Sequence, residues 1–147
     1  YHREVWLMER QALILCTENS ARSQMAEALV NHDLAGRWHA RSAGTQPADR
    51  VHPLAVRAMA EIGLDIADQV PKHISTVAGE RFDSVITVCD NARRSCPAWL
   101  GPAVHVTHIE IPDPVLASGD DEQRLEAFRQ ARDAVRARIV EYLSQLE

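Results

Sequence analysis

The sequence predicts a single α/β domain with a four-stranded parallel sheet and helices on both faces. Short apolar runs that are typical of buried strands alternate with stretches in which apolar residues recur at helical spacing. This alternation favours a parallel sheet that is covered on both sides. The 147 residues, 46% of them hydrophobic, suffice for one core, and the chain has no internal repeat, low-complexity tract or linker.

The first half of the chain predicts two strands and two helices. We expect a buried strand at 12–15, a helix from about 20–22 to 36, an extended segment at 38–43 and a helix at 53–62. Apolar residues at helical spacing support the first helix: Met25, Ala26, Leu29 and Val30. Pro53 suits the first turn of the second helix, while Gly36 and Gly63 are natural ends for the two helices.

The second half predicts two more strands and a long terminal helix. The β-branched run at 82–89 favours a central strand, and a further strand is expected at 103–111, whereas residues 65–80 give no clear signal. From residue 120 onward one apolar stripe has helical period: Leu125, Phe128, Ala131, Val135, Ile139 and Leu143. We expect the domain to span 8–147, with residues 1–7 an upstream segment or an expression remnant, because Met8 directly precedes the first apolar run.

Composition excludes several classes of protein. The net charge of −5 argues against a nucleic-acid binder, because phosphate backbones need a basic face. No stretch approaches the ~18 apolar residues of a membrane span, and no signal-peptide pattern is present. Three cysteines, an odd number, in a chain without a secretion signal indicate a reducing compartment. We therefore expect a monomer in the cytoplasm, with neither nucleic acid nor membrane as a partner.

A loop rich in small polar residues follows the first predicted strand. The string CTENSARS places Cys16 at the carboxyl end of that strand, where open α/β sheets bind ligands, and Arg22 near the start of the next helix. Helix N-termini present free N–H groups and partial positive charge, and arginine matches tetrahedral oxyanions with two parallel hydrogen bonds. We expect the loop to bind an oxyanion through six residues: Thr17, Glu18, Asn19, Ser20, Ala21 and Arg22.

The same surroundings make Cys16 a candidate nucleophile. Positive charge near a thiol favours the thiolate, which is the reactive form. Ser23 could donate a hydrogen bond to the sulfur, and Asn19 suits a loop position with positive φ. A bare cysteine and arginine six residues apart would be a weak signal, and the alternative is a buried strand end beside a surface arginine. The fuller string C-T-x-N-S-x-R-S, between a strand and a helix, is far more specific.

These residues carry a resemblance to a known family. CTENSARSQMAEAL resembles the phosphate-binding loop of the low-molecular-weight tyrosine phosphatase fold, in particular that of its thioredoxin-coupled arsenate reductases. The SAG at 42–44 and the Asp113-Pro114 pair fall where that family has them, and the resemblance spans about residues 12–145. It implies that Cys16 is the nucleophile, that Arg22 binds the oxyanion and that Asp113 is the general acid, although an Asp-Pro pair alone is also common in turns.

The other two cysteines favour reduction over phosphate-ester hydrolysis. Cys89 and Cys96 bracket a short polar stretch that could bring the two sulfurs to disulfide distance. The resemblance implies a relay in which Cys16 attacks arsenate, Cys89 attacks Cys16, and Cys96 then forms a disulfide with Cys89. Two resolving cysteines imply thioredoxin as the reductant, with phosphate or sulfate as mimics of arsenate. Val115-Leu116 stands where the phosphatases present tyrosines, which counts against a phosphotyrosyl substrate.

Two alternatives stay open at this point. One is a low-molecular-weight phosphatase acting on small or tyrosyl phosphoesters. The other is a non-catalytic module that senses oxyanions or redox state through the same loop.

Two positions depart from the family pattern. Glu18 puts a carboxylate where the family has a small or neutral side chain, so we expect it to point to solvent. Some relatives bind potassium behind the loop through positions that match Asn19, Glu27 and Ser42, and the remaining acidic position falls on Lys72. The Lys72 ammonium could therefore replace the cation, although a solvated surface lysine is the alternative. The seven histidines have no metal-ligand spacing, and we expect no cofactor, with potassium behind the loop left as a possibility.

Overall fold

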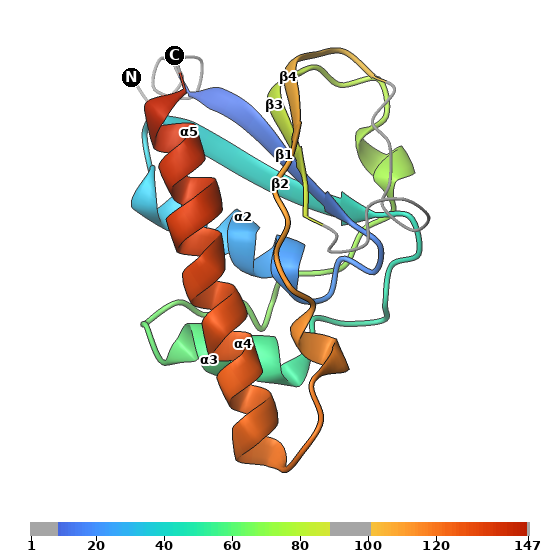
Figure 1. Ribbon diagram of the computed structural model, residues 1–147. Coiled ribbons are helices and arrows are strands. Elements are labelled where there is room, and N and C mark those ends of the chain that lie inside the picture. The colour runs from blue at the N-terminus through green and yellow to red at the C-terminus, as the bar shows by residue number, and fades with distance from the viewer. Residues whose placement is uncertain (1–8, 89–100, 147) are drawn as a thin grey trace.

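The computed structural model describes residues 9–88 and 101–146, and its centre is one parallel β-sheet (Figure 1). The sheet has four strands in the order β2-β1-β3-β4. They are β1 (Arg10–Cys16), β2 (Trp38–Gly44), β3 (Phe82–Thr87) and β4 (Ala103–His108). All pairings are parallel, which confirms the predicted sheet.

Helical segments connect and cover the strands. The α-helices are α2 (Arg22–Asp33), α3 (Pro53–Ala60), α4 (Asp121–Val135) and α5 (Glu141–Gln145). Two short 3₁₀ helices are η1 (Ile74–Val77) and η2 (Pro114–Leu116), and a π-helical turn, η3 (Arg136–Val140), joins α4 to α5. The apolar stripe from residue 120 onward thus forms one long terminal helix with a wide turn inside it.

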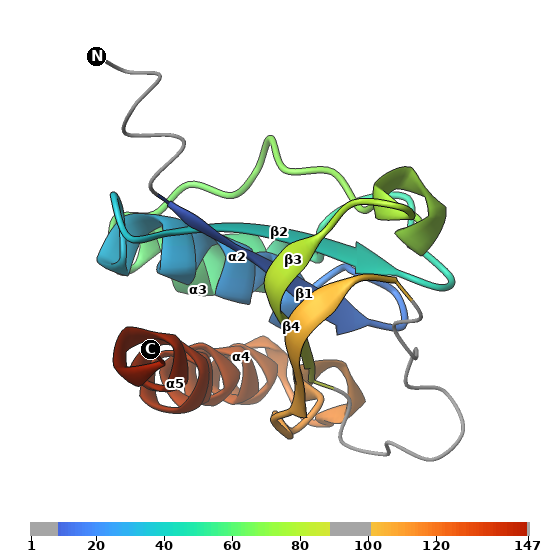
Figure 2. The same cartoon turned by 90° about the horizontal axis from the view of Figure 1, so that it is seen from above.

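The two faces of the sheet are covered unequally. Alternate residues of β1 point to opposite sides: Ile14 belongs to the large core under α2, α3, α4 and α5, whereas Leu13 belongs to a smaller cluster with Val77 of η1. Figure 2 shows the sheet between the long terminal helix on one side and η1 on the other. Helices therefore lie on both faces, but within the described residues the α-helices all pack on the face of Ile14.

Several predicted element ends move in the structure. Strand β3 ends at Thr87 instead of residue 89, and β4 ends at His108 instead of residue 111. Pairing continues more loosely beyond the strands, since the Ile111 N–H still donates to the Val88 carbonyl at 3.2 Å. The stretch 65–80, which gave no clear signal, contains η1. No described helix is long and apolar enough to cross a membrane.

Ion pairs tie the terminal helix to α2 and α3. Arg129 binds Glu61 at 2.8 Å, Arg132 binds the same carboxylate at 3.1 Å, and Arg136 binds Asp33 at 2.8 Å. The hydrogen bond from Arg129, together with that from Arg132, holds the pKa of Glu61 at about 2. These ion pairs fix the polar face of the terminal helix to its two neighbouring helices.

The sheet topology brings the carboxyl ends of three strands together. Cys16 is in register with Gly44 of β2, and Leu15 is in register with Thr87 of β3. The loop after β1 therefore begins between two neighbouring strand ends, at the edge where ligands bind in open α/β sheets.

Candidate active site

The Cys16 thiol lies inside the loop that joins β1 to α2. Its residue is 4% exposed, and the sulfur accepts the Asn19 N–H at 3.2 Å. The Ser23 hydroxyl lies 2.9 Å from the sulfur. The Asn19 amide donates to that same Ser23 oxygen at 2.7 Å, so the hydroxyl hydrogen is free to point to Cys16. Two donors thus meet at the sulfur, and both stabilise its anionic form.

Asn19 determines the shape of the loop. It is fully buried with φ of 52°, the only non-glycine residue with positive φ among those described. Asparagine tolerates this conformation better than most residues. Its side-chain oxygen accepts from the Lys72 N–H at 2.9 Å and from the Gln24 amide at 3.0 Å. The positive φ expected at Asn19 is therefore found, and the structure adds the partners that hold it.

The loop carbonyls face a neighbouring segment, residues 46–52. Gln46, Ala48 and His52 donate their N–H groups to the carbonyls of residues 17, 18 and 20, at 2.8, 2.9 and 2.8 Å. The C=O and N–H of a trans peptide unit point in opposite directions. The N–H groups of residues 18, 19 and 21 are thereby turned away from this segment, towards the concave side of the loop. One of them, that of residue 19, reaches the Cys16 sulfur.

Gly44 permits the close approach of β2 to the loop. A Cβ atom on Gly44 would lie inside van der Waals contact with the Thr17 carbonyl oxygen and 2.9 Å from the Cys16 oxygen. Both neighbours are backbone atoms, which cannot move aside as a side chain could. The Gly44 N–H also donates to the Lys72 carbonyl at 2.8 Å. Only glycine fits this position, which gives the SAG at 42–44 a physical reason.

Arg22 connects the loop to the segment that carries Asp113. Its guanidinium is largely buried and donates to the carbonyls of Val88 and Ile111 at 3.3 and 3.0 Å. A second nitrogen lies 3.5 Å from the Asp113 carboxylate. The other carboxylate oxygen of Asp113 accepts the Val115 N–H at 3.0 Å and caps η2. The structure thus brings the two predicted residues into one ion pair beside the loop.

The predicted outward orientation of Glu18 is confirmed, because its side chain is exposed.

His52 is a polar group near the loop that the sequence did not indicate. Its Nδ1 accepts the Leu54 N–H at 3.1 Å and its ring packs on Phe128 with centroids 4.7 Å apart. Burial lowers the pKa of His52, and the charges of Arg124 and Arg50 lower it further, so at neutral pH the ring stays an acceptor.

Two glutamines behind the loop were also missed. Gln24 is fully buried and donates to the backbone and side-chain oxygens of Asn19, both at 3.0 Å. Gln69 in turn donates to the Gln24 side chain at 2.7 Å. In the sequence, the available signal was a glutamine in the first turn of the helix after the loop. Its partner Gln69 lies 45 residues away, so the sequence did not indicate the contact.

Lys72 and Glu27 form an ion pair behind the loop, with side chains that are 33% and 16% exposed. The Lys72 ammonium is 3.8 Å from the Glu27 carboxylate and donates to the Val70 carbonyl at 3.2 Å. Ser42 donates to the same Glu27 oxygen at 2.8 Å. The Lys72 ammonium thus lies beside the carboxylate that the resemblance assigns to a potassium site. Among the described residues, no group of three histidines, cysteines or carboxylates could hold a metal ion.

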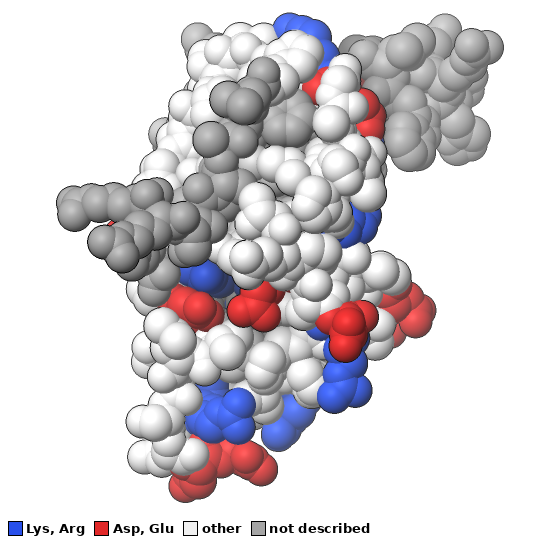
Figure 3. Space-filling model, turned by 90° about the vertical axis from the view of Figure 1, so that its right-hand side faces the viewer, with Lys and Arg blue, Asp and Glu red and all other residues white. Residues whose placement is uncertain are grey.

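One face of the molecule carries charges of both signs. Figure 3 shows the molecule from the right-hand side of Figure 1, and acidic and basic side chains gather together in the lower half of this view. Val115 and Leu116 follow Asp113 and are 40% and 75% exposed. They are aliphatic, so they offer no aromatic wall at that point.

Cys89 and Cys96 lie outside the described residues.

Comparisons with known proteins agree with this geometry. Residues 11–147 match the family described as low molecular weight phosphotyrosine protein phosphatase. An arsenate reductase from Shouchella clausii is 42% identical over 129 residues, which cover 87% of this chain and 91% of the relative. A solved arsenate reductase in the phosphate binding state has a TM-score of 0.76 at 30% identity, covering 94% of this chain and 99% of that one.

A thioredoxin-dependent arsenate reductase from Corynebacterium glutamicum has a TM-score of 0.64 at 27% identity. The alignment covers 97% of this chain and 66% of that one. The chain belongs to the low molecular weight phosphotyrosine protein phosphatase family, and within it to the arsenate reductases. The family and fold expected from the sequence are confirmed.

Substituting Gly44 tests how the loop is held. We expect Gly44→Ala to displace the Thr17 carbonyl and to weaken phosphate binding at least about tenfold, because overpacking of this kind costs about 1–3 kcal/mol. Calorimetric titration with phosphate measures the affinity. Gly36→Ala is the matched control: its φ of 83° makes the substitution strained, but nothing lies within 4 Å of the added Cβ. Phosphate affinity unchanged in Gly44→Ala would contradict this account of the loop.

Proposed function

We propose that this chain reduces arsenate to arsenite through a relay of Cys16, Cys89 and Cys96, with thioredoxin as the electron donor. The observation that carries the proposal is the hydrogen-bonded Cys16 sulfur within an oxyanion-type loop. It occurs in a chain whose relatives are arsenate reductases.

The first step would bind and activate arsenate. The N–H groups of the 17–22 loop and Arg22 hold its oxygens, and the Cys16 thiolate attacks arsenic to form a sulfur–arsenic bond. One oxygen leaves as water after Asp113 donates a proton to it. The 3.5 Å ion pair supports this assignment, because it keeps Asp113 beside the anion-binding arginine.

The following steps move two electrons. Cys89 attacks the sulfur of Cys16, a Cys16–Cys89 disulfide forms, and the sulfur–arsenic bond breaks with its electron pair left on arsenic as arsenite. Cys96 then attacks Cys89, which yields a Cys89–Cys96 disulfide and frees the Cys16 thiolate. The dithiol of thioredoxin reduces that disulfide and becomes a disulfide itself. The relative from Corynebacterium glutamicum is described as thioredoxin-dependent, which supports this choice of donor.

A coupled assay tests the proposed reaction. Arsenate, thioredoxin, thioredoxin reductase and NADPH are supplied, and NADPH loss and arsenite are measured together. We expect one NADPH oxidised per arsenite formed. Cys96→Ser should stall after about one turnover with Cys16 bonded to Cys89, which intact-protein and peptide mass spectrometry detect.

The same assay separates the alternatives. A phosphatase would hydrolyse p-nitrophenyl phosphate equally well after loss of Cys89 or Cys96 and would oxidise no NADPH with arsenate. A sensing module would bind the anion and form the disulfide without releasing arsenite. Either result with intact protein would refute the reductase proposal.

We further propose that the Lys72 ammonium acts in place of a bound potassium ion. The 3.8 Å approach to Glu27 supports this, because a positive charge there balances the carboxylate behind the loop. Lys72 is also the only lysine of the chain. Its backbone binds Asn19 through the N–H and Gly44 through the carbonyl, so the side chain and the loop are linked at one residue.

Replacing Lys72 tests the role of its charge. The wild type should turn over equally in potassium and choline chloride. We expect Lys72→Ala to lower kcat/KM about tenfold, less than the ~100-fold loss that a 1 Å misplacement can cause, and potassium to restore part of it. Arg81→Ala is the control, since it also removes one positive charge but pairs with Asp83 near the start of β3, at 3.3 Å. Steep stimulation of the wild type by potassium would contradict the proposal.

A further inference from the structure

Asp113 lies in a chain segment that has few backbone anchors. Residues 109–113 continue from β4, and the N–H groups of Ile109 and Ile111 donate to the carbonyls of Thr87 and Val88 at 2.8 and 3.2 Å. The next residue is Pro112, and another proline follows Asp113. Proline has no N–H, so these two positions cannot donate to β3 or to any other element. The carbonyl groups of the segment can supply anchors in addition to these two N–H groups.

Two arginines from different elements bind successive carbonyls of this segment. Arg22, at the start of α2, donates to the Ile111 carbonyl at 3.0 Å. Arg138, in the π-helical turn η3, donates to the Glu110 carbonyl at 2.7 Å. Bonds from a charged donor are stronger than bonds between neutral groups. The chain just before the proposed acid is thus held from two sides.

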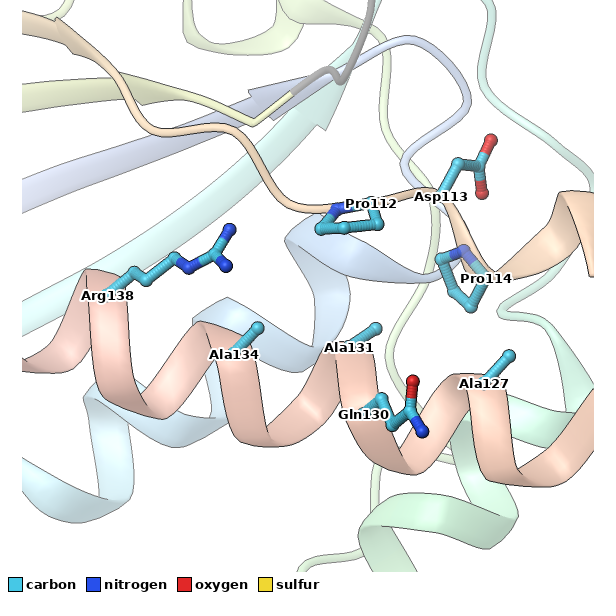
Figure 4. Close-up of a pocket in the computed structure, with 8 residues that line it drawn as sticks. All are labelled: Pro112, Asp113, Pro114, Ala127, Gln130, Ala131, Ala134 and Arg138. Carbon is cyan, nitrogen blue, oxygen red and sulfur yellow. The ribbon is translucent and has the colours of Figure 1, made fainter.

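Ile111 is fully buried in the main core, but the chain on either side of Asp113 borders a hollow. A hollow of about 250 Å³ separates the segment from α4, lined on one side by Pro112 and Pro114 and on the other largely by alanines. Figure 4 shows the Arg138 side chain reaching from the helix towards the chain before Pro112, while the Asp113 carboxylate points away from the hollow. Short alanine side chains cannot fill this space, so Arg138 bridges it with a hydrogen bond.

We propose that Arg138 is a positioning residue for Asp113. Through the Glu110 carbonyl it fixes the chain that leads to the acid, and Arg22 fixes the next carbonyl. This inference rests on the proposed function, in which Asp113 donates a proton to the leaving oxygen. Arg138 itself touches neither the substrate nor Cys16 in this account.

The π-helical turn supplies a matched control. Arg136 belongs to the same turn, but its guanidinium binds Asp33 of α2 at 2.8 and 3.1 Å and not the segment before Asp113. Arg136→Ala removes the same charge and a comparable helix contact. It therefore reports any loss of activity that comes only from a loosened terminal helix.

The test is a double-mutant cycle on arsenate turnover. We expect Arg138→Ala to lower kcat about tenfold with KM for arsenate unchanged, a part of the ~100-fold or more that a general acid supplies. Arg136→Ala should keep the wild-type kcat. In the Asp113→Ala background, where no acid remains, Arg138→Ala should have no further effect, because the two residues act through one step.

A measurement without turnover keeps this inference separate from the proposed function. The Val115 N–H donates to the Asp113 carboxylate, so its amide resonance in a nitrogen-15 correlation spectrum reports the position of that group. We expect this resonance to shift in Arg138→Ala and to stay in place in Arg136→Ala. An unchanged Val115 resonance would overturn the inference even if the wild type reduced no arsenate. So would an equal loss of kcat from Arg138→Ala with and without Asp113.

Discussion

The site depends on the hydrogen bonds between the 17–20 carbonyls and the 46–52 segment. Three N–H donors of that segment hold the carbonyl side of the loop, which turns N–H groups towards the Cys16 sulfur. A loop of free carbonyls would repel an oxyanion, whereas this one presents donors on its concave side. Gly44 is the condition for the arrangement, because any side chain there would push β2 away from Thr17.

The remaining contacts at the site extend this constraint to distant parts of the chain. Asn19 binds Gln24 and the Lys72 backbone, and the Lys72 ammonium pairs with Glu27. Arg22 binds the Ile111 carbonyl and pairs with Asp113, so it links the loop to the segment that carries the proposed acid. The proposed nucleophile and the proposed acid are therefore positioned by two sets of hydrogen bonds, one around Asn19 and one around Arg22.

The sequence predicted the parts of the site that are local. Cys16, Asn19 and Ser23 lie within eight residues, so their roles follow from a strand, a turn and a helix start. His52, Gln24 and Arg138 were not identified, because their partners are brought together only by packing of separate elements.

The fold was predictable to a similar extent. The parallel direction of the strands followed from the alternation of elements, whereas their order in the sheet came only from the structure. Strand β3 ended two residues early because the pairing loosens beyond Thr87. The roles of Cys89 and Cys96 stay predictions.

Protection of Cys16 by an oxyanion tests the central claim most directly. In protein carrying Cys89→Ser and Cys96→Ser, Cys16 is the only thiol of the three that the sequence contains. Its alkylation by iodoacetamide is followed by mass spectrometry at increasing phosphate. If the loop holds a tetrahedral anion against the sulfur, the alkylation rate falls with phosphate in a saturable way. An alkylation rate that is the same with and without phosphate would contradict the account.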